Sequence, residues 1–390
     1  MARKLKSTRP RRERAVLVSV SSKRKRSLLD PQDSLNELAE LARTAGATVV
    51  SRLTQRVDRP SHTYLGKGKL KELYDTCSEL DVDTVICDDE LSPTQQRNLE
   101  DQLGERKVID RTALILDVFA SRARTREGRL QVELAQHEYL LPRLAGQWTH
   151  LERLGGGIGT RGPGETQIET DRRLVRGRLQ KLKSEIQGVR RHRKLHRSKR
   201  SSNQIPVVSL VGYTNAGKST LLNRITRAGV RAENLMFSTL DPVTRRIQLP
   251  SDRPALLTDT VGFIHKLPTS LVASFRATLE EIAESSLIVH VVDSTHKNAP
   301  EQVSVVETIL EELGLRDVPV ITALNKSDLI SSEVESRWGA DGVRYVEMMS
   351  ADAADSVRVS ALTGDGVDEL LEKVDDMLTA ADAGVVTLGA

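Results

Sequence analysis

The segment Val207–Leu222, VVSLVGYTNAGKSTLL, constrains the fold of this chain more than any other stretch. An apolar run typical of a buried strand leads into the loop Gly212–Ser219, which fits the pattern G-x-x-x-x-G-K-[S/T], and a helix-like run follows. In such a loop the backbone N–H groups face a phosphate chain, the lysine reaches the β- and γ-phosphates, and the last hydroxyl binds magnesium. The pattern therefore predicts a nucleotide-phosphate site in an α/β domain, with Lys218 and Ser219 in these two roles.

Two motifs downstream complete the predicted phosphate and metal site. Asp259-Thr260-Val261-Gly262 follows an apolar run, so Asp259 can hold magnesium through water and the Gly262 N–H can meet the γ-phosphate. The second motif is the loop MFSTLDPVTRR, 236–246, which lies between the phosphate loop and Asp259. A threonine in this loop can close on magnesium when the γ-phosphate is present. We assign that role to Thr239, with Ser238 as the alternative.

Two further motifs predict the choice of base. Asn325-Lys326-Ser327-Asp328 follows an apolar strand, and the Asp328 carboxylate can accept hydrogen bonds from guanine N1 and the N2 amine, a pair of donors that adenine lacks. Asn325 would brace this loop and the Lys326 stem would cover the base. Ser360-Ala361-Leu362 follows the last predicted strand and can offer a backbone N–H to guanine O6. Motifs in this order, each at the carboxyl end of a strand, predict an enzyme that converts GTP to GDP and phosphate.

The predicted site residues form three overlapping sets. Catalytic roles are assigned to Lys218, Thr239 and Gly262, and the Mg²⁺ ligands are Ser219, Thr239 and Asp259. The expected contacts to GTP or GDP are Gly212, Tyr213, Thr214, Asn215, Ala216, Gly217, Lys218, Ser219, Thr220, Phe237, Ser238, Thr239, Asp259, Thr260, Val261, Gly262, Asn325, Lys326, Asp328, Ser360, Ala361 and Leu362.

Two residues near the phosphates raise further hypotheses. Phe263 follows Gly262 where many GTPases carry a glutamine that orients water, so slow intrinsic hydrolysis is expected, and simple packing under the loop is compatible with it. Asn215 precedes Lys218 by three positions, where potassium-stimulated GTPases carry an asparagine. A K⁺ ion there could stabilise negative charge, although asparagine also suits a tight loop sterically.

The order of strand-like and helix-like segments predicts an α/β protein with several parts. We expect a basic disordered arm at 1–14, a small parallel α/β domain at 15–123 and a helical linker arm at 124–203 with a glycine-rich loop at 155–164. A P-loop GTPase domain with a mostly parallel sheet is expected at 204–380, and a C-terminal tail at 381–390.

The charge is concentrated in two segments. Between Arg172 and Arg200 there are 13 lysines and arginines and one acidic residue, whereas the whole chain carries a net charge of only +4. The first 26 residues hold a second basic cluster, and the two together favour a polyanionic partner such as RNA, with a solvated helix face as the alternative for either one. Because the chain has only two cysteines, we expect a reducing, cytoplasmic location. No apolar run is long enough for a membrane span. We also expect a monomer.

Several stretches resemble one family in particular. GGGIGTRGPGETQIETDRR at 155–173, together with FSTLDPVTRR, DTVGFI and FRATLEEI, resembles the HflX family of ribosome-associated GTPases over nearly the whole chain. The resemblance implies an N-terminal α/β domain, a helical arm and a GTPase domain. It also implies binding to the large ribosomal subunit and its rRNA, and a role in splitting or rescuing stalled ribosomes.

Two other functions are compatible with the sequence. A ribosome-assembly or RNA-binding scaffold could use the nucleotide as a passive switch, and a signalling GTPase could act without RNA. The Gly66-Lys67-Gly68-Lys69 turn before a helix could contact RNA phosphate, hold a second nucleotide such as ATP, or be a plain basic turn.

Overall fold

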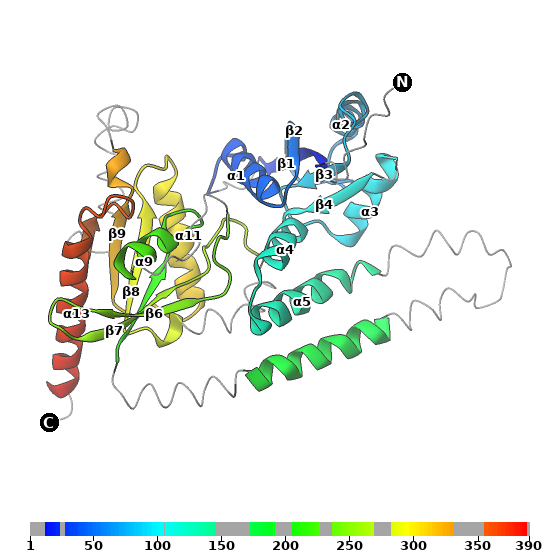
Figure 1. Cartoon of the computed structure of the whole chain (residues 1–390). Coiled ribbons are helices and arrows are strands. Elements are labelled where there is room, and N and C mark those ends of the chain that lie inside the picture. Colours follow the sequence, from blue (N-terminus) through cyan, green and yellow to red (C-terminus); the bar gives the residue numbers. More distant parts are fainter. Residues whose placement is uncertain are drawn as a thin grey trace, which may run out of the picture. The chain divides into compact units, whose positions relative to one another are not determined.

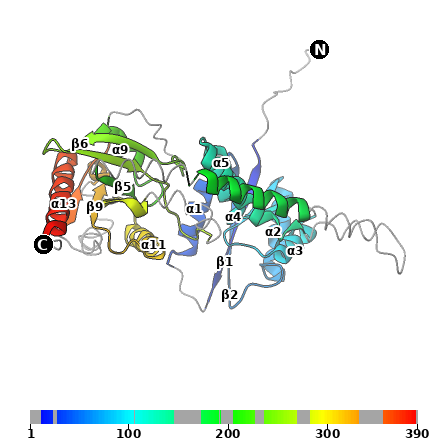
Figure 2. The same ribbon diagram turned by 90° about the horizontal axis from the view of Figure 1, so that it is seen from below.

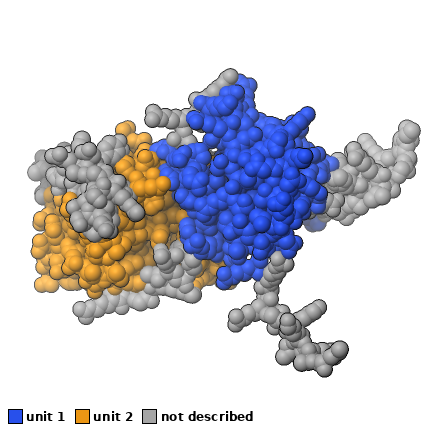
Figure 3. All heavy atoms as spheres, turned by 90° about the horizontal axis from the view of Figure 1, so that it is seen from above, with its two compact units in different colours: residues 1–118, 136–177 blue, residues 119–135, 178–390 orange. Residues whose placement is uncertain are grey.

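The computed structural model describes residues 12–23, 28–104, 106–144, 172–189, 191, 205–226, 236–268, 282–330 and 355–387. The chain divides into two compact units, shown in two colours in Figure 3. One unit comprises Met1–Val118 and Gln136–Gly177, and the other comprises Phe119–Ala135 and Arg178–Ala390. The domain limits expected from the sequence stay a prediction.

The first unit is built on a four-stranded parallel sheet with the order β2-β1-β3-β4 (Figure 1). Its strands are β1 (Arg14–Ser22), β2 (Thr48–Val57), β3 (Thr84–Cys87) and β4 (Lys107–Asp110). Its helices are α1 (Pro31–Thr44), α2 (Lys67–Glu79) and α3 (Pro93–Gln102), while α4 (Arg111–Arg122) and α5 (Arg126–Leu140) have residues in both units.

Local sequence explains why these elements form. All four residues of β3 are buried, as expected for a strand covered on both faces of a parallel sheet. Helix α3 starts at a capping box, in which Ser92 accepts from the Gln95 backbone N–H and the Gln95 side chain accepts from the Ser92 backbone, with Pro93 in the first turn.

The second unit holds a six-stranded sheet with the order β10-β9-β8-β5-β7-β6. Every neighbouring pair is parallel except β6 with β7. Its strands are β5 (Val207–Val211), β6 (Val243–Gln248), β7 (Pro254–Asp259), β8 (Leu287–Asp293), β9 (Val320–Asn325) and β10 (Ser356–Arg358). Its helices are α9 (Lys218–Thr226), α11 (Ala299–Glu312) and α13 (Val367–Thr387), and its 3-10 turns are η1 (Ile282–Glu284) and η2 (Ser327–Leu329).

This topology gathers the sequence motifs at one edge of the sheet. The phosphate loop follows β5, Asp259 ends β7 and Asn325 ends β9. Because β5, β7, β8 and β9 run parallel, their carboxyl ends share that edge, which is where open α/β sheets bind ligands.

Helix α5 and a helix at 172–189 lie side by side and are called the helical hairpin below. The helix at 172–189 runs antiparallel to α5, because Arg178 pairs with Glu133 while Arg126 pairs with Glu185 (Figure 2). The helix buries Leu179, Leu182 and Ile186, so one of its faces is apolar.

The predicted fold class is confirmed, and the differences from the sequence lie in the lengths of elements. Helix α1 begins at Pro31, because proline fits the first turn, where its missing N–H costs nothing. Helix α13 continues past residue 380 to Thr387, into the segment expected as a tail, through a stretch with several alanines, which favour helix. The glycine-rich loop expected at 155–164 lies outside the described residues. Within the described ranges, no helix has both the length and the apolar character needed to cross a bilayer.

Candidate functional site

The phosphate loop connects β5 to α9 and places a buried lysine at the start of the helix. Lys218 Nζ donates to the carbonyl oxygens of Gly212 at 3.0 Å and Tyr213 at 2.8 Å. Burial lowers the pKa of Lys218 to about 8, while the nearby Asp259 carboxylate acts in the opposite direction. A phosphate chain at this helix N-terminus would meet both the lysine charge and the free N–H groups of the first turn.

Asn325 ties the phosphate loop to the loop after β10. Its Nδ2 donates to the Ala216 carbonyl at 2.7 Å, and its Oδ1 accepts from the Ala361 N–H at 2.9 Å. Gly217 has a φ of +100°, and a Cβ at this position would overlap Asn325 Nδ2. Glycine is therefore required here both for the backbone conformation and for the close approach of the amide.

Three side-chain oxygens from three segments meet beside Lys218. Ser219 Oγ lies 2.6 Å from Asp259 Oδ2 and 2.8 Å from Thr239 Oγ1, and Thr239 Oγ1 donates to Asp259 Oδ2 at 2.8 Å. All three residues are buried. The structure therefore brings together the three predicted metal ligands, and it places Thr239 rather than the alternative Ser238 in this hydrogen-bonded cluster.

The chemistry of this cluster fits a small hard cation. Within the described part of the chain, Asp259 Oδ1 is buried without a hydrogen-bond partner. Burial raises the pKa of Asp259 above its usual value, although the Lys218 charge and the hydroxyl groups of Ser219 and Thr239 reduce this shift. Carboxylate and hydroxyl oxygens are the donors that Mg²⁺ prefers, so a cation held by these groups would satisfy the orphaned oxygen and offset the desolvation of the carboxylate.

The segment after Asp259 is fastened to the phosphate loop through the backbone. Thr214 N–H donates to the Phe263 carbonyl at 2.7 Å, and Phe263 N–H donates to the Gly212 carbonyl at 3.1 Å. The Tyr213 hydroxyl accepts from the His265 N–H at 2.8 Å. The Phe263 side chain is fully buried, so it packs in the interior at the position where other GTPases present a glutamine to water.

The base-side motifs form a second cluster. Asp328 Oδ1 accepts from Ser360 Oγ at 2.6 Å, and Lys326 Nζ lies 2.6 Å from Asp293 Oδ2. The Ala361 N–H is already bound to Asn325 and Leu362 is 70% exposed, so the donor to guanine O6 stays a prediction. Asp293, which ends β8, is not among the residues predicted from the sequence. A polar residue at the carboxyl end of a buried strand was the available signal.

The structure places most of the predicted phosphate-side residues around one small hollow. The residues that line it are Thr214, Asn215, Gly217, Lys218, Ser219, Thr220, Phe237, Ser238, Thr239, Thr260 and Gly262. The base-side residues lie at the end of β9 and in the loops after β9 and β10, and they do not line this hollow. The contact of each residue with nucleotide remains a prediction.

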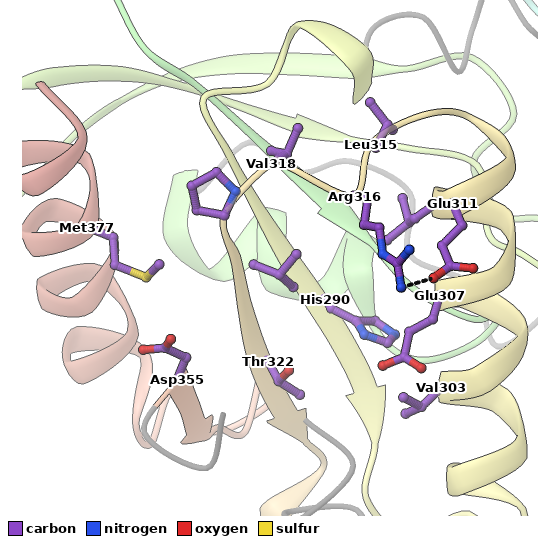
Figure 4. A pocket seen from close by; sticks show the side chains of 13 residues that line it. His290, Val303, Glu307, Glu311, Leu315, Arg316, Val318, Thr322, Asp355 and Met377 are labelled. Carbon is purple, nitrogen blue, oxygen red and sulfur yellow. Dashed lines mark ion pairs between the residues drawn. The ribbon is translucent and has the colours of Figure 1, made fainter. Parts of the chain in front are cut away.

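A larger cavity of about 460 Å³ lies elsewhere in the second unit, between β8, β9, α11 and α13 (Figure 4). Its lining includes His290, Glu307 and the ion pair of Arg316 with Glu311. Burial lowers the pKa of His290 to about 4, and the positive charge of Lys218 adds to this shift, so the imidazole is neutral at pH 7. None of the predicted nucleotide residues lines this cavity.

Three family models match consecutive parts of the chain. The GTP-binding GTPase N-terminal model matches residues 32–120, and the GTP-binding GTPase middle-region model matches residues 122–200. The model described as a 50S ribosome-binding GTPase matches residues 207–326.

Curated relatives match over almost the full length. The GTPase HflX of Lacrimispora saccharolytica is 50% identical over 94% of this chain and 83% of its own length. The GTPase HflX of Escherichia coli is 43% identical, with the same two coverages. Among solved structures, a complex of the protein SsGBP with GDP aligns with a TM-score of 0.50 and 26% identity, over 94% of this chain and 99% of that one.

Proposed function

Because this chain belongs to the HflX family of GTPases, we propose that it binds the large ribosomal subunit and uses GTP binding and hydrolysis to split or rescue stalled ribosomes. GTP binding and hydrolysis are the activity of the family. The ribosomal part of the proposal draws on the 50S ribosome-binding GTPase model matched at 207–326 and on the surface of the helical arm.

The observation that carries this proposal is the exposed basic face of the helix at 172–189. On the part of this helix that is not buried, the side chains of Arg173, Arg176, Lys181 and Lys183 are exposed. An amphipathic helix with one apolar face and one cationic face is suited to contact rRNA phosphates. The glycine-rich loop at 155–164 lies outside the described residues, and we propose that it reaches further into the RNA, because glycines allow close backbone approach.

Mg²⁺ is the second part of the proposal. Ser219 and Thr239 would bind it directly and Asp259 through water, and the ion would neutralise the charge that develops on the transferred phosphate. Lys218 would bind the β- and γ-phosphates, and the Gly262 N–H would hold the γ-phosphate while water attacks it. We propose a cytoplasmic monomer as the acting form.

We expect removal of two arm cations to weaken binding to the large subunit. The double variant Arg176→Ser with Lys183→Ser should reduce affinity and should flatten the slope of log affinity against log salt by about 1 to 2, because fewer counterions are released. Sedimentation with purified large subunits at several salt concentrations, with a GTP analogue, with GDP and without nucleotide, measures both quantities.

A matched control removes the same charge elsewhere. Lys297 and Arg316 are exposed residues of the second unit outside the arm, so Lys297→Ser with Arg316→Ser should leave binding and salt slope unchanged. Equal affinities and equal slopes for the parent and the arm variant would show that the basic face is only solvated.

A scaffold that uses nucleotide as a passive switch is the second candidate. It would bind RNA through the same face, but subunits would not accelerate its hydrolysis. The hydrolysis rate of the parent with and without large subunits separates the two functions, since only the first predicts stimulation.

Asn215 supports a proposal of its own, a K⁺ ion beside the phosphates. It is exposed at the rim of the hollow with a φ of +63°, a backbone conformation that asparagine tolerates well, which keeps the steric alternative open. If a K⁺ ion stabilises the developing charge, hydrolysis should be faster in K⁺ than in Na⁺ at equal ionic strength. Identical rates in the two salts would contradict the K⁺ site.

A further inference from the structure

Two contacts join the loop that carries Thr239 to the turn between α4 and α5, one on each side of the threonine. On the first side, the Phe237 ring meets the Phe119 ring edge to face, with centroids 4.6 Å apart and planes at 82°. Both rings are 2% exposed, and the Phe237 N–H also donates to Thr214 Oγ1 at 3.2 Å. This aromatic pair fixes the loop two residues before Thr239.

On the second side, Asp241 binds the start of α5. Its Oδ2 accepts from the N–H groups of Arg124 at 2.7 Å and Thr125 at 2.8 Å, and its Oδ1 accepts from Thr125 Oγ1. Thr125 Oγ1 in turn accepts from the Gly128 N–H at 2.9 Å, which is the contact of a helix N-cap. A carboxylate in this place also complements the positive end of the helix dipole.

The sequence of α5 is adapted to this carboxylate. Gly128 lies in the first turn of α5, where alanine would be favoured for helix formation. A Cβ on Gly128 would overlap Asp241 Oδ1. The glycine therefore permits the approach of Asp241, at some cost in helix propensity.

We propose that the α4–α5 turn, residues Phe119–Gly128, is a positioning element for GTP hydrolysis that acts on Thr239 from within the same chain. Phe119 contacts Phe237, and Thr125 binds Asp241. The short segment between Phe237 and Asp241 carries Thr239, whose Oγ1 lies next to Ser219 and Asp259. Phe119, Thr125 and Asp241 act through Thr239 and touch no reacting atom.

The coupling runs in both directions. If the contacts at Phe119 and Thr125 favour the closed position of Thr239, then a γ-phosphate that holds Thr239 must favour the Asp241 cap on α5 to the same extent. Helix α5 is half of the hairpin that carries the basic face, so the nucleotide would control how firmly the base of this hairpin is capped. The effect of these contacts on GTP hydrolysis can be measured without ribosomes, so it is independent of the ribosomal proposal.

Gly128→Ala provides the sharpest test, because it strengthens the helix and displaces the carboxylate. In the full chain without ribosomes, we expect kcat for GTP to fall about tenfold, as the loss of about 1.4 kcal/mol of transition-state stabilisation would give. The affinity for GDP, which needs no closed Thr239, should stay within about twofold. Gly177→Ala is the matched control, since this helical glycine has open space around it, and it should keep the parent kcat.

A double-mutant cycle separates positioning from packing. Asp241→Ala alone should lower kcat like Gly128→Ala, and the two together should cost no more than either alone, because the added methyl group then has no carboxylate to displace. Thr125→Ser keeps the hydroxyl group and should retain the parent rate, whereas Thr125→Val should not. A parent-like kcat in Gly128→Ala, or additive losses in the double variant, would overturn the proposal.

Amide hydrogen exchange tests the reverse direction in the parent protein. The amides of Arg124, Thr125 and Gly128 should exchange more slowly with a GTP analogue than with GDP, because the cap is complete only when Thr239 is closed. Equal exchange in the two states would show that α5 does not sense the nucleotide.

Discussion

Lys218→Ala is expected to lower the GTP hydrolysis rate by about 10²- to 10³-fold, the usual effect of removing one preorganised donor from a developing negative charge. In the folded protein, Lys218 is buried at the first turn of α9 with its ammonium group on the carbonyls of the phosphate loop. Alanine keeps the helix and removes the cation, so binding of the triphosphate should also weaken. Single-turnover hydrolysis at saturating GTP measures the chemical step separately from binding.

The first control for this variant is to show that the protein still folds. The thermal unfolding midpoint without nucleotide should change little, because alanine favours helix and relieves the desolvation of a buried charge. Lys297→Ala removes an exposed lysine from the same unit and should keep the parent rate. A folded Lys218→Ala protein with turnover within about tenfold of the parent would place the chemistry elsewhere.

Asp328→Asn should shift nucleotide preference from GTP toward xanthosine triphosphate by about ten- to a hundredfold. The asparagine side chain offers one acceptor oxygen to the guanine N1–H and N2 amine, and one unpaired buried donor costs about 1–3 kcal/mol. Xanthine carries a carbonyl at C2, to which the asparagine amide can donate.

Competition binding with the two triphosphates measures this shift directly. Ser360 Oγ donates to Asp328 Oδ1 in the parent, so Ser360→Ala is a useful companion that removes the support and keeps the carboxylate. It should reduce affinity for GTP without reversing the preference. Unchanged selectivity in Asp328→Asn would remove this residue from base recognition.

The positions of the motifs could be predicted from the sequence because simple rules determine them. A buried parallel strand reads as a continuous apolar run, and the residue after it must lie at the ligand-binding edge of the sheet. Asp259 and Asn325 were found in this way. The fold class followed from the same alternation of strands and helices.

The contacts between distant segments could not be predicted in this way. Asp241 is 116 residues from Thr125, and Asn325 is 36 residues from Ala361. Such pairs depend on how helices and loops pack after the sheet has formed, and neither apolar periodicity nor local propensity carries that information. Gly128 illustrates the difficulty. In the sequence it is only a glycine within a predicted helix, and the reason for it is visible only when Asp241 is known to lie against it.

The Asn325 amide gives the nucleotide site a property that neither loop has alone. One planar group is hydrogen bonded to the phosphate loop on one side and to the base-side loop on the other. A displacement of either loop would therefore disturb the other, and if the two loops hold the phosphates and the base as proposed, the two ends of a bound nucleotide would be held and released together. Partial dissociation, with the base free and the phosphates still held, would require this amide to give up one of its two partners. Exchange of GDP for GTP should thus proceed as one cooperative opening rather than as two independent steps.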